Sequence, residues 1–364
     1  MGDRSGGSSD EPLGGALWYT PPMPVAPFAR RNILVTGGAG FIGSQLCETL
    51  VKDANVICID NFSSSTPRNI EGLLQHPSFE FVNHDITQPI QLEQLPELAH
   101  FKLGVQGIQE IYHLACPISR LHYEQFRIAT ILTNSIGLKN VLDVAVQYKA
   151  KVLYASSSVL YGGRRPESPY VREESPCAID HLTSHGAYDE GKRFSESVLY
   201  TYADVYGIDV KITRIFRTYG PRMKIHDGHL LPDMIKSALD GEEIVIRMPE
   251  GARVSLCYVS DLIDGMIRHM GTSMDVTVVN VGSDYDLSWA EVAEKIIRLT
   301  NSASHVRFEA PEQLTGEAPL PDLQRARTLL HWVPLVRLEE GLAKMIDYAR
   351  SHRQQVGVFH AQND

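Results

Sequence analysis

Tyr188 and Lys192 stand four positions apart in the run A-Y-D-E-G-K-R-F-S-E, a spacing that could carry acid–base chemistry. On a helix, side chains at positions i and i+4 share a face, so the phenol and the ammonium would lie together. A neighbouring ammonium favours the phenolate and lowers the pKa of a phenol from its usual value of ~10. The pair could therefore act as a general base near neutral pH, although tyrosine and lysine at this spacing often form only a solvated helix face.

Three consecutive serines, Ser156–Ser158, follow the apolar run Val152–Ala155, which is typical of a buried strand. They would then lie at the carboxyl end of that strand, the edge where open α/β sheets bind their ligands. A hydroxyl there could hydrogen-bond a substrate oxygen as it loses its proton. Ser157 is the first candidate for this role, and a plain serine-rich turn is the alternative.

A glycine-rich stretch could bind the cofactor of a reaction in which this base takes part. The sequence N-I-L-V-T-G-G-A-G-F-I-G runs from Asn32 to Gly43, between an apolar strand pattern and a helix pattern. Glycines at this spacing permit a tight turn, let backbone N–H groups approach a pyrophosphate, and let the helix pack closely on the strand. The helix N-terminus adds partial positive charge. The predicted dinucleotide site at this turn comprises Gly37, Gly40, Phe41, Ile42 and Gly43.

Asp60 indicates which dinucleotide is bound. The apolar run Val56–Ile59 ends at this residue, 17 positions past Gly43, close to the ~20 expected for an acid that binds the ribose 2′-hydroxyl. A carboxylate would repel the extra phosphate of NADP. The sequence therefore predicts NAD as the cofactor.

Composition excludes several other classes of protein. The chain has 364 residues, 43% of them hydrophobic and 21% charged, as expected of a globular protein. The net charge of −10 argues against general nucleic-acid binding. Neither a signal peptide nor an apolar run of the ~18 residues that span a membrane is evident. The five cysteines are scattered and never spaced C-x-x-C, which predicts reduced thiols, a cytoplasmic location and no structural metal site.

Strand-like and helix-like stretches alternate from Arg30 onward. This order predicts an α/β fold of the Rossmann type, a doubly wound parallel sheet with a smaller C-terminal substrate-binding lobe. The expected strands are 32–36, 55–59, 79–82, 108–114, 151–155 and 210–215. The expected helices are 43–52, 67–75, 122–148, 187–206, 288–300 and 338–351, and Asp261 is expected to cap a helix that follows it.

The predicted domain boundaries follow from composition and from where the alternation loosens. Residues 1–30 are expected to be a disordered Gly/Ser/Pro-rich arm, 31–216 an NAD-binding Rossmann domain, 217–352 mainly the substrate-binding lobe, and 353–364 a polar tail. The helices predicted at 122–148 and 187–206 could form the helix bundle of a dimer interface, or simply be core helices.

Several short motifs together carry a family resemblance. They are G-G-A-G-F-I-G at 37–43, D-N-F at 60–62, H-D-I at 84–86, Y-H-L-A at 112–115, T-N-x-x-G at 133–137, S-S-S-x-x-Y-G at 156–162, Y-D-E-G-K-R at 188–193, R-I-F-x-T-Y-G-P-R-M at 214–223 and Y-V-S-D-L at 258–262. From about residue 31 to about 350 the chain resembles the extended short-chain dehydrogenase/reductases that act on nucleotide sugars. Within that group it looks most like the UDP-glucuronate decarboxylases, because of Y-D-E-G-K-R and of W-x-P-L-x-x-L-E-E-G-L at 332–342.

The resemblance implies a homodimeric, NAD-dependent enzyme with a UDP-sugar substrate. Tyr188 would take the proton of the sugar C4 hydroxyl while NAD takes the hydride, Lys192 would hold the nicotinamide ribose, and Ser157 would bind the C4 oxygen. The resulting 4-ketone is β to the C6 carboxylate, so carbon dioxide could leave, and reduction would then give UDP-xylose. Further cofactor contacts implied by the resemblance are Asn61, Asp85, Ile86 and Leu114. Substrate contacts implied in the same way are Ser158, Arg217, Arg222 and Arg253.

Three positions depart from the decarboxylase pattern. Val159 replaces a glutamate, Arg217 replaces an asparagine near the substrate diphosphate, and Val254 replaces an arginine that is displaced here to Arg253. A β-keto acid can lose carbon dioxide without a base, so decarboxylation is still expected. A UDP-sugar 4-epimerase needs only Ser, Tyr, Lys, NAD and room for the sugar to turn, and is the alternative. An NAD-binding scaffold without turnover is a third reading, and a sugar 4,6-dehydratase is not expected, because Ser158 and Val159 offer no acid/base pair.

Overall fold

The computed structural model describes residues 30–117, 123–165, 167–225, 228–273, 277–310 and 317–360. The arm predicted at the N-terminus lies outside these ranges except for Arg30, and so do the last residues, 361–364. Within the described ranges, no helix is both long enough and apolar enough to cross a membrane.

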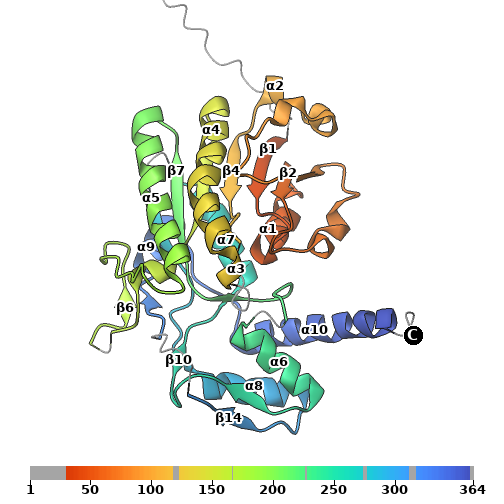
Figure 1. Cartoon of the computed structure of the whole chain (residues 1–364), viewed down its shortest axis with the longest axis vertical. Helices are drawn as coiled ribbons and strands as arrows, with labels where there is room; N and C mark the ends of the chain where they lie inside the picture. Colours follow the sequence, from red (N-terminus) through yellow and green to blue (C-terminus); the bar gives the residue numbers. More distant parts are fainter. Residues whose placement is uncertain are drawn as a thin grey trace, which may run out of the picture.

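The described residues form a seven-stranded sheet in the order β12-β7-β5-β4-β1-β2-β3, with every neighbouring pair parallel (Figure 1). Its strands are β1 (Arg31–Thr36), β2 (Ala54–Asp60), β3 (Phe79–Asn83), β4 (Glu110–His113), β5 (Lys151–Ser157), β7 (Val210–Ile215) and β12 (Thr277–Val281). This arrangement confirms the predicted Rossmann-type fold. The edge strand β12 was not predicted, and it comes from the part of the chain assigned mainly to the other lobe.

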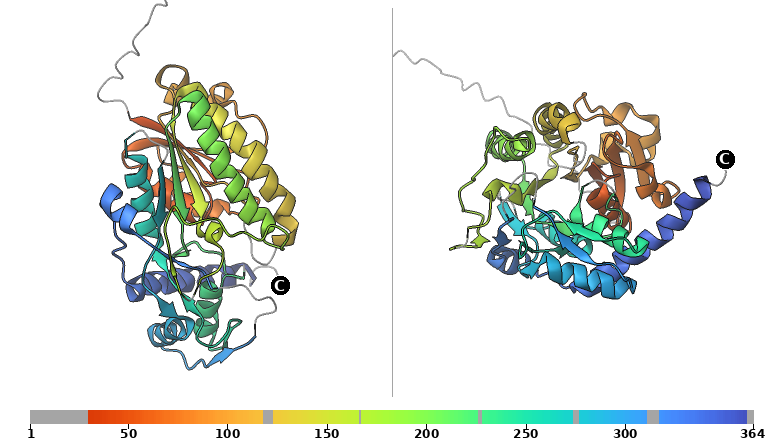
Figure 2. Two further views of the ribbon diagram at one scale, coloured as in Figure 1. Left: turned by 90° about the vertical axis from the view of Figure 1, so that its left-hand side faces the viewer. Right: turned by 60° about the horizontal axis from the view of Figure 1, so that its bottom comes forward.

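Helices cover both faces of this sheet (Figure 2). On β1, Ile33 and Val35 join one hydrophobic cluster and Leu34 joins the other, so the strand is buried on both sides. The helices of this domain are α1 (Phe41–Leu50), α2 (Leu103–Gln106), α3 (Tyr123–Leu132), α4 (Leu138–Tyr148), α5 (Gly186–Tyr206), α7 (Val259–Met270) and α9 (Gln324–Leu330). The helices α4 and α5 pack on one face, and α1 and α7 on the other.

A smaller lobe lies beyond the carboxyl ends of the strands (Figure 1). It contains α6 (Leu230–Asp240), α8 (Trp289–Thr300), α10 (Leu338–His360) and the short strand pairs β9 (Ile244–Ile246) with β14 (Val306–Phe308) and β10 (Arg253–Val254) with β13 (Leu287–Ser288). Two further pairs connect it to the sheet domain, namely β8 (Thr218–Tyr219) with β11 (Cys257–Tyr258) and β6 (Tyr170–Val171) with β15 (Leu320–Pro321).

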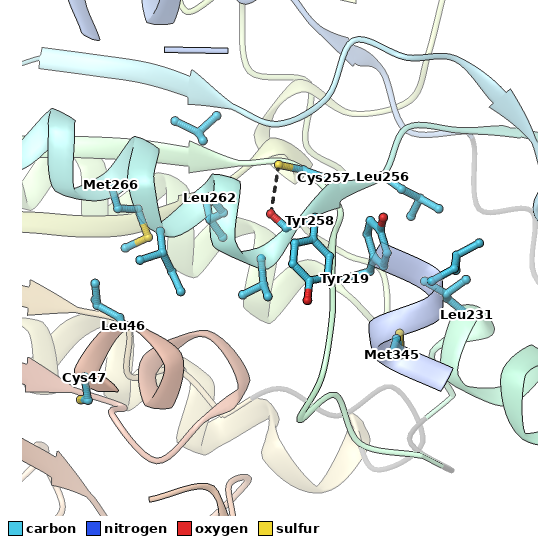
Figure 3. Packing of buried hydrophobic residues seen from close by; sticks show 14 of the residues in the cluster. Leu46, Cys47, Tyr219, Leu231, Leu256, Cys257, Tyr258, Leu262, Met266 and Met345 are labelled. Atoms are coloured by element: carbon cyan, nitrogen blue, oxygen red, sulfur yellow. Dashed lines mark hydrogen bonds between the residues drawn. The ribbon is translucent and has the colours of Figure 1, made fainter. Parts of the chain in front are cut away.

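One hydrophobic cluster runs from the sheet domain into this lobe without a break. In Figure 3, Leu46 and Met266 of the sheet domain and Leu231 and Met345 of the lobe lie on either side of Tyr258. All of these side chains are at most 6% exposed. The two lobes therefore share a core.

Two predicted helices are interrupted in the structure. The segment predicted at 67–75 forms two 3₁₀ turns, η1 (Pro67–Asn69) and η2 (Glu71–Leu73), because Ile70 between them leaves helical geometry with φ −113° and ψ 0°. The long helix predicted at 122–148 is divided by a π-helical turn, η5 (Thr133–Gly137), between α3 and α4. Other 3₁₀ turns are η3 (Leu92–Gln94), η4 (Pro96–Phe101) and η6 (Ser158–Tyr161).

Two further details of the prediction were wrong. The Asp261 carboxylate does not cap a helix, because it accepts hydrogen bonds from the backbone N–H groups of Leu335 and Val336, at 3.0 and 2.9 Å. It therefore anchors the segment that leads into α10. That helix continues to His360, beyond the expected end at 351.

Because two histidines are buried, we expect the fold to lose stability in acid. His269 lies between the hydroxyls of Thr213 and Thr277, at 2.9 Å from each, and burial together with the charge of Lys211 lowers its pKa to about 3. Burial and a nearby ammonium lower the pKa of His113 to about 3 as well. Between pH ~6.5 and ~3 the unfolded chain binds protons that the folded chain does not. Each histidine should therefore remove about 1.4 kcal/mol of stability per pH unit as the pH falls through that window.

Urea unfolding at pH 7, 6, 5 and 4 checks this expectation. A His269→Asn variant should lose stability on acidification less steeply than the wild type, by about 1.4 kcal/mol per pH unit. Equal slopes for the two proteins would show that His269 does not stay neutral in the fold.

Candidate active site

The turn between β1 and α1 has space only for glycine at two of the predicted positions. Gly37 has φ +74°, and a Cβ atom there would lie 2.6 Å from the backbone nitrogen of Ala115. A Cβ atom on Gly43 would lie 2.2 Å from the carbonyl oxygen of Gly37. Gly40 is the N-cap of α1, and within the described chain no side chain caps this N-terminus. Its N–H groups and its positive dipole end can therefore receive a phosphate.

Asp60 ties the end of β2 to this turn. One carboxylate oxygen accepts a hydrogen bond from the backbone N–H of Ala39 at 3.0 Å. The other accepts from the backbone N–H of Phe62 at 2.9 Å and from the Ser65 hydroxyl at 2.7 Å. Carboxylate oxygens can accept further bonds, so Asp60 is placed to bind a ribose hydroxyl.

Most of the predicted cofactor residues line one cleft next to Asp60. Those that do are Gly37, Gly40, Asp60, Asn61, Asp85, Ile86 and Leu114. Phe41, Ile42 and Gly43 form the first turn of α1, next to the cleft. The Asp85 carboxylate accepts hydrogen bonds from the N–H and the hydroxyl of Thr87, both at 2.9 Å, so it closes a local turn. A glycine turn, an uncapped helix N-terminus and an acid at the next strand fit an NAD molecule.

Replacing Asp60 with alanine should weaken NAD binding roughly ten- to a hundredfold. A hydrogen bond to a charged group contributes about 1.5–3 kcal/mol, and the loop bonds to Ala39, Phe62 and Ser65 would be lost as well. Isothermal titration calorimetry with NAD checks this. Asp53→Ala, at an exposed acid just before β2, is the matched control and should bind like the wild type. Equal affinities for the two variants would exclude Asp60 from the site.

The structure brings the three predicted catalytic residues together. Tyr188 hydrogen-bonds the hydroxyl of Ser157, which lies at the end of β5 and also accepts from the backbone N–H of Val159 at 3.3 Å. Lys192, one turn along α5 from Tyr188, is only 3% exposed. Its Nζ donates to the carbonyl oxygen of Ala155 at 2.8 Å and lies 5.8 Å from the centre of the Tyr188 ring. The arrangement can accept a proton from a substrate hydroxyl.

The sequence predicts a lowered pKa for the Tyr188 phenol, but in the structure this pKa is raised. Burial raises the pKa of Tyr188 to about 12, while the Lys192 charge and the Ser157 hydrogen bond act in the opposite direction. The prediction weighed the ammonium and not the loss of water around the phenol. Additional positive charge in this pocket would lower the pKa again and let Tyr188 act as a general base near neutral pH.

A buried ion pair that sequence reasoning missed holds α5 against the sheet. The guanidinium of Arg214, on β7, donates to both carboxylate oxygens of Glu196, at 2.9 and 2.7 Å. Glu196 also accepts from Ser156, the neighbour of Ser157, at 2.6 Å. Arg214 further donates to the Tyr161 hydroxyl at 2.9 Å. Glu196 lies one turn beyond Lys192 on α5, so this network fixes the catalytic helix relative to the strand that carries Ser157.

The π-helical turn η5 packs against the same helix. A Cβ atom on Gly191 would lie 3.1 Å from the amide nitrogen of Asn134, so glycine between Tyr188 and Lys192 allows a close approach. The Asn134 side-chain oxygen accepts from the Tyr154 hydroxyl at 2.8 Å. The motif T-N-x-x-G at 133–137 was noted in the sequence, but nothing in it indicated this contact.

Two of the predicted substrate arginines, Arg222 and Arg217, contact different parts of the protein. Arg222 donates to Glu48 at 2.8 Å and to the Ser44 hydroxyl at 3.2 Å, so it lies against α1. The guanidinium of Arg217 lies 5.6 Å from the centre of the Trp289 ring. Each of these groups has protein partners, so their contacts with a substrate stay predictions.

Arg253 also has a protein partner, and its contact with a substrate stays a prediction as well. Its Nε donates to the Asp286 carboxylate at 2.7 Å, and its side chain is 43% exposed. Val254, at the position where the decarboxylase pattern has arginine, is buried in the core of the lobe. Ser158 begins the turn η6 directly after Ser157 and is half-buried.

A Rossmann sheet with this glycine turn, and with Ser157, Tyr188 and Lys192 at the carboxyl ends of its strands, defines an NAD-dependent short-chain dehydrogenase/reductase. The comparison with protein families agrees: the "NAD dependent epimerase/dehydratase family" matches residues 33–282. The chain belongs to this family, and its cofactor is NAD.

The similar proteins include UDP-glucuronic acid decarboxylases and a UDP-glucuronic acid 4-epimerase. The chain is 36% identical to UDP-glucuronic acid decarboxylase 1 of Xenopus tropicalis, over 91% of this chain and 75% of the relative. It is 35% identical to UDP-glucuronic acid decarboxylase 3 of Arabidopsis thaliana, over 89% of this chain and 91% of the relative. Among solved structures, UDP-glucuronic acid 4-epimerase of Bacillus cereus, in complex with UDP-glucuronic acid and NAD, superposes with a TM-score of 0.75 and 26% identity, over 88% of this chain and 99% of that one.

Proposed function

We propose that this protein decarboxylates UDP-glucuronate to UDP-xylose through transient oxidation at C4. The observation that carries the proposal is the identity of about 35% to proteins of that name over about nine-tenths of the chain. The hydrogen-bonded Ser157–Tyr188 pair with Lys192 beside it supports an oxidation that begins by removing a hydroxyl proton.

The site residues have distinct parts in this reaction. NAD, when bound, supplies the redox chemistry at C4 and a positive charge that offsets the burial of the phenol. Tyr188 takes the C4 hydroxyl proton, and Ser157 holds the C4 oxygen. In the 4-keto acid the C5–C6 bond breaks, carbon dioxide leaves, and the electron pair forms an enolate that takes a proton at C5. Tyr188 then returns its proton to the C4 oxygen as C4 regains the hydride that it gave up in the first step, so the reaction has no net oxidation. One proton is consumed for each carbon dioxide released.

Incubating the protein with NAD and UDP-glucuronate tests the proposal. NMR and mass spectrometry should show UDP-xylose and a mass loss equal to carbon dioxide, with NAD needed only in catalytic amount. A product of unchanged mass, or unchanged substrate, would exclude the decarboxylase function.

A UDP-glucuronate 4-epimerase is the second candidate, and Val159 favours it. This half-buried residue follows Ser157 by two positions and puts a methyl-bearing side chain where the decarboxylase pattern has a carboxylate. The epimerase of Bacillus cereus is structurally similar to the chain. In the assay above, a product of unchanged mass with inverted C4 would identify this activity. Val159→Glu should then raise carbon dioxide release relative to inversion.

We also propose that two copies associate through α3 and α5. Large apolar side chains on these two helices and on the turn η5 that follows α3 face the solvent at 46–70% exposure, namely Ile128, Ile131, Ile136 and Phe194. An exposed apolar patch of this kind is typical of a protein–protein contact. Ile128→Asp should produce a monomer in light scattering coupled to gel filtration. Val105→Asp, at an equally apolar and exposed position on α2, should leave the mass unchanged, and a monomeric wild type would contradict the proposal.

A cytoplasmic location is supported by the cysteines. All five are free thiols, and Cys47, Cys58 and Cys257 are buried. Thiols persist in reducing compartments. Fluorescence imaging of the tagged protein tests this part of the proposal.

A further inference from the structure

His113 has a buried nitrogen that no described residue satisfies. The residue ends β4, is 1% exposed, and its Nδ1 lies 2.6 Å from the hydroxyl oxygen of Thr36. Its Nε2 is sealed from solvent and has no hydrogen-bond partner within the described chain. Buried polar atoms are nearly always paired with protein or with ordered water. This nitrogen therefore indicates an interaction that the cofactor cleft does not explain.

Lys192 has donors to spare in the same region. An ammonium carries three N–H donors, and the described residues give this one a single acceptor, the carbonyl oxygen of Ala155. Its Nζ lies 4.5 Å from the centre of the Tyr154 ring, and the ring of His113 lies 5.5 Å from that same centre. The unpaired His113 ring nitrogen and the Lys192 ammonium, which has N–H donors left, thus both lie near the ring of Tyr154. They form no direct hydrogen bond with each other.

The state of the imidazole follows from its surroundings. Burial first and the Lys192 charge second lower the pKa of His113, so the ring is neutral at physiological pH. A neutral ring has one N–H and one lone pair. Nδ1 lies against Thr36, so Nε2 is the ring nitrogen left for the lone pair, which a nearby cation favours. Nδ1–H then donates to Thr36.

We propose that one buried water bridges His113 Nε2 and Lys192 Nζ, which makes His113 a positioning residue for the Lys192–Tyr188 pair. The water would donate to Nε2 and accept from the ammonium, and two such partners are sufficient for a buried water. No covalent bond changes. The effect on rate rests on the proposed function, whereas the presence of the water does not.

The water would keep the ammonium charged and directed toward Tyr188. The titratable groups that act on the two tyrosines beside this ammonium, Tyr154 and Tyr188, include Glu196 on α5 and Cys116 just after β4. Without the water the ammonium loses an acceptor, and the phenolate becomes harder to form. The acidic limb of the kcat profile should then move up by about one pH unit, which is about a tenfold lower kcat below that limb.

Two substitutions at one position separate this role from a structural one. His113→Asn can keep the contact with Thr36 but has no acceptor at the place of Nε2, whereas His113→Gln can reach that place and loses the contact with Thr36. We expect the shifted profile in His113→Asn and a kcat within about threefold of wild type in His113→Gln. The reverse order would show that His113 serves only to hold β4 to β1.

A structural measurement decides the matter independently of turnover. A crystal structure of the NAD-bound wild type that resolves waters should show one within hydrogen-bond distance of both nitrogens, and His113→Asn should lack it. Absence of the water in the wild type would overturn the proposal. If the water is present while UDP-glucuronate is not converted, the proposed function fails and the bridging site stands.

Discussion

Replacing Tyr188 with phenylalanine is expected to lower kcat by roughly a thousandfold. A positioned general base contributes about 10²- to 10⁴-fold to a reaction rate. Tyr188 is hydrogen-bonded to the Ser157 hydroxyl, and the Lys192 ammonium lies beside its ring. The substitution removes one oxygen and leaves the ring, so packing on α5 should be preserved. Initial rates of carbon dioxide release from UDP-glucuronate, at saturating substrate, measure the effect.

The controls separate loss of chemistry from loss of structure. Tyr200→Phe changes a tyrosine on the same helix that is 61% exposed, and should keep the wild-type rate. Tyr188→Phe should still bind NAD and unfold at the same urea concentration as the wild type. Turnover that persists in Tyr188→Phe would remove this residue from the mechanism. A wild type that binds NAD but converts no UDP-sugar would favour an NAD-binding scaffold.

Replacing Arg214 with leucine should cost about 3–5 kcal/mol of unfolding free energy. Its side chain and that of Glu196 are 8% and 13% exposed, and removing one partner of a buried pair leaves the other charge without compensation. The Tyr161 hydroxyl and the backbone carbonyl of Glu173 would each lose a hydrogen bond from Arg214 as well. Because Glu196 links α5 to β5, kcat should also fall in the fraction that stays folded. Urea unfolding and steady-state kinetics measure the two effects.

An exposed ion pair provides the comparison for Arg214. Lys139 pairs with Asp143 one turn away on α4, with both side chains at least half exposed. Exposed pairs contribute about 0.2–1 kcal/mol, so Lys139→Leu should change stability by less than about 1 kcal/mol. If the two leucine variants were equally stable, the buried network would not be what holds the catalytic helix.

The sequence predicted the parts of the site that lie close together along the chain. Gly37 and Gly43 are recognisable because backbone geometry allows nothing else there. Tyr188 and Lys192 are recognisable because helical periodicity places them on one face. The six predicted strands were found because each is a short segment in which apolar residues run together or alternate with polar ones.

What the sequence did not predict depends on contacts between distant segments. The strand β12 is short, and its pairing with β7 joins residues more than sixty positions apart. Arg214 and Glu196 have no spacing that marks them as partners. The π turn at Asn134 reflects its packing against Gly191. The raised pKa of Tyr188 follows from burial, which a list of nearby charges does not reveal.

Because the two lobes share a core, we expect them to unfold together. In the sequence, strand β12 and helix α7 both follow α6, which belongs to the smaller lobe. A fragment ending near residue 216 would therefore lack the edge strand β12 and the helices α7 and α9, and neither half is a self-sufficient folding unit. Calorimetry should show a single cooperative melting transition rather than two. Exchanging substrate specificity by grafting a whole lobe from a relative would thus disrupt the cofactor domain, and loops at the cleft are the units that can be exchanged.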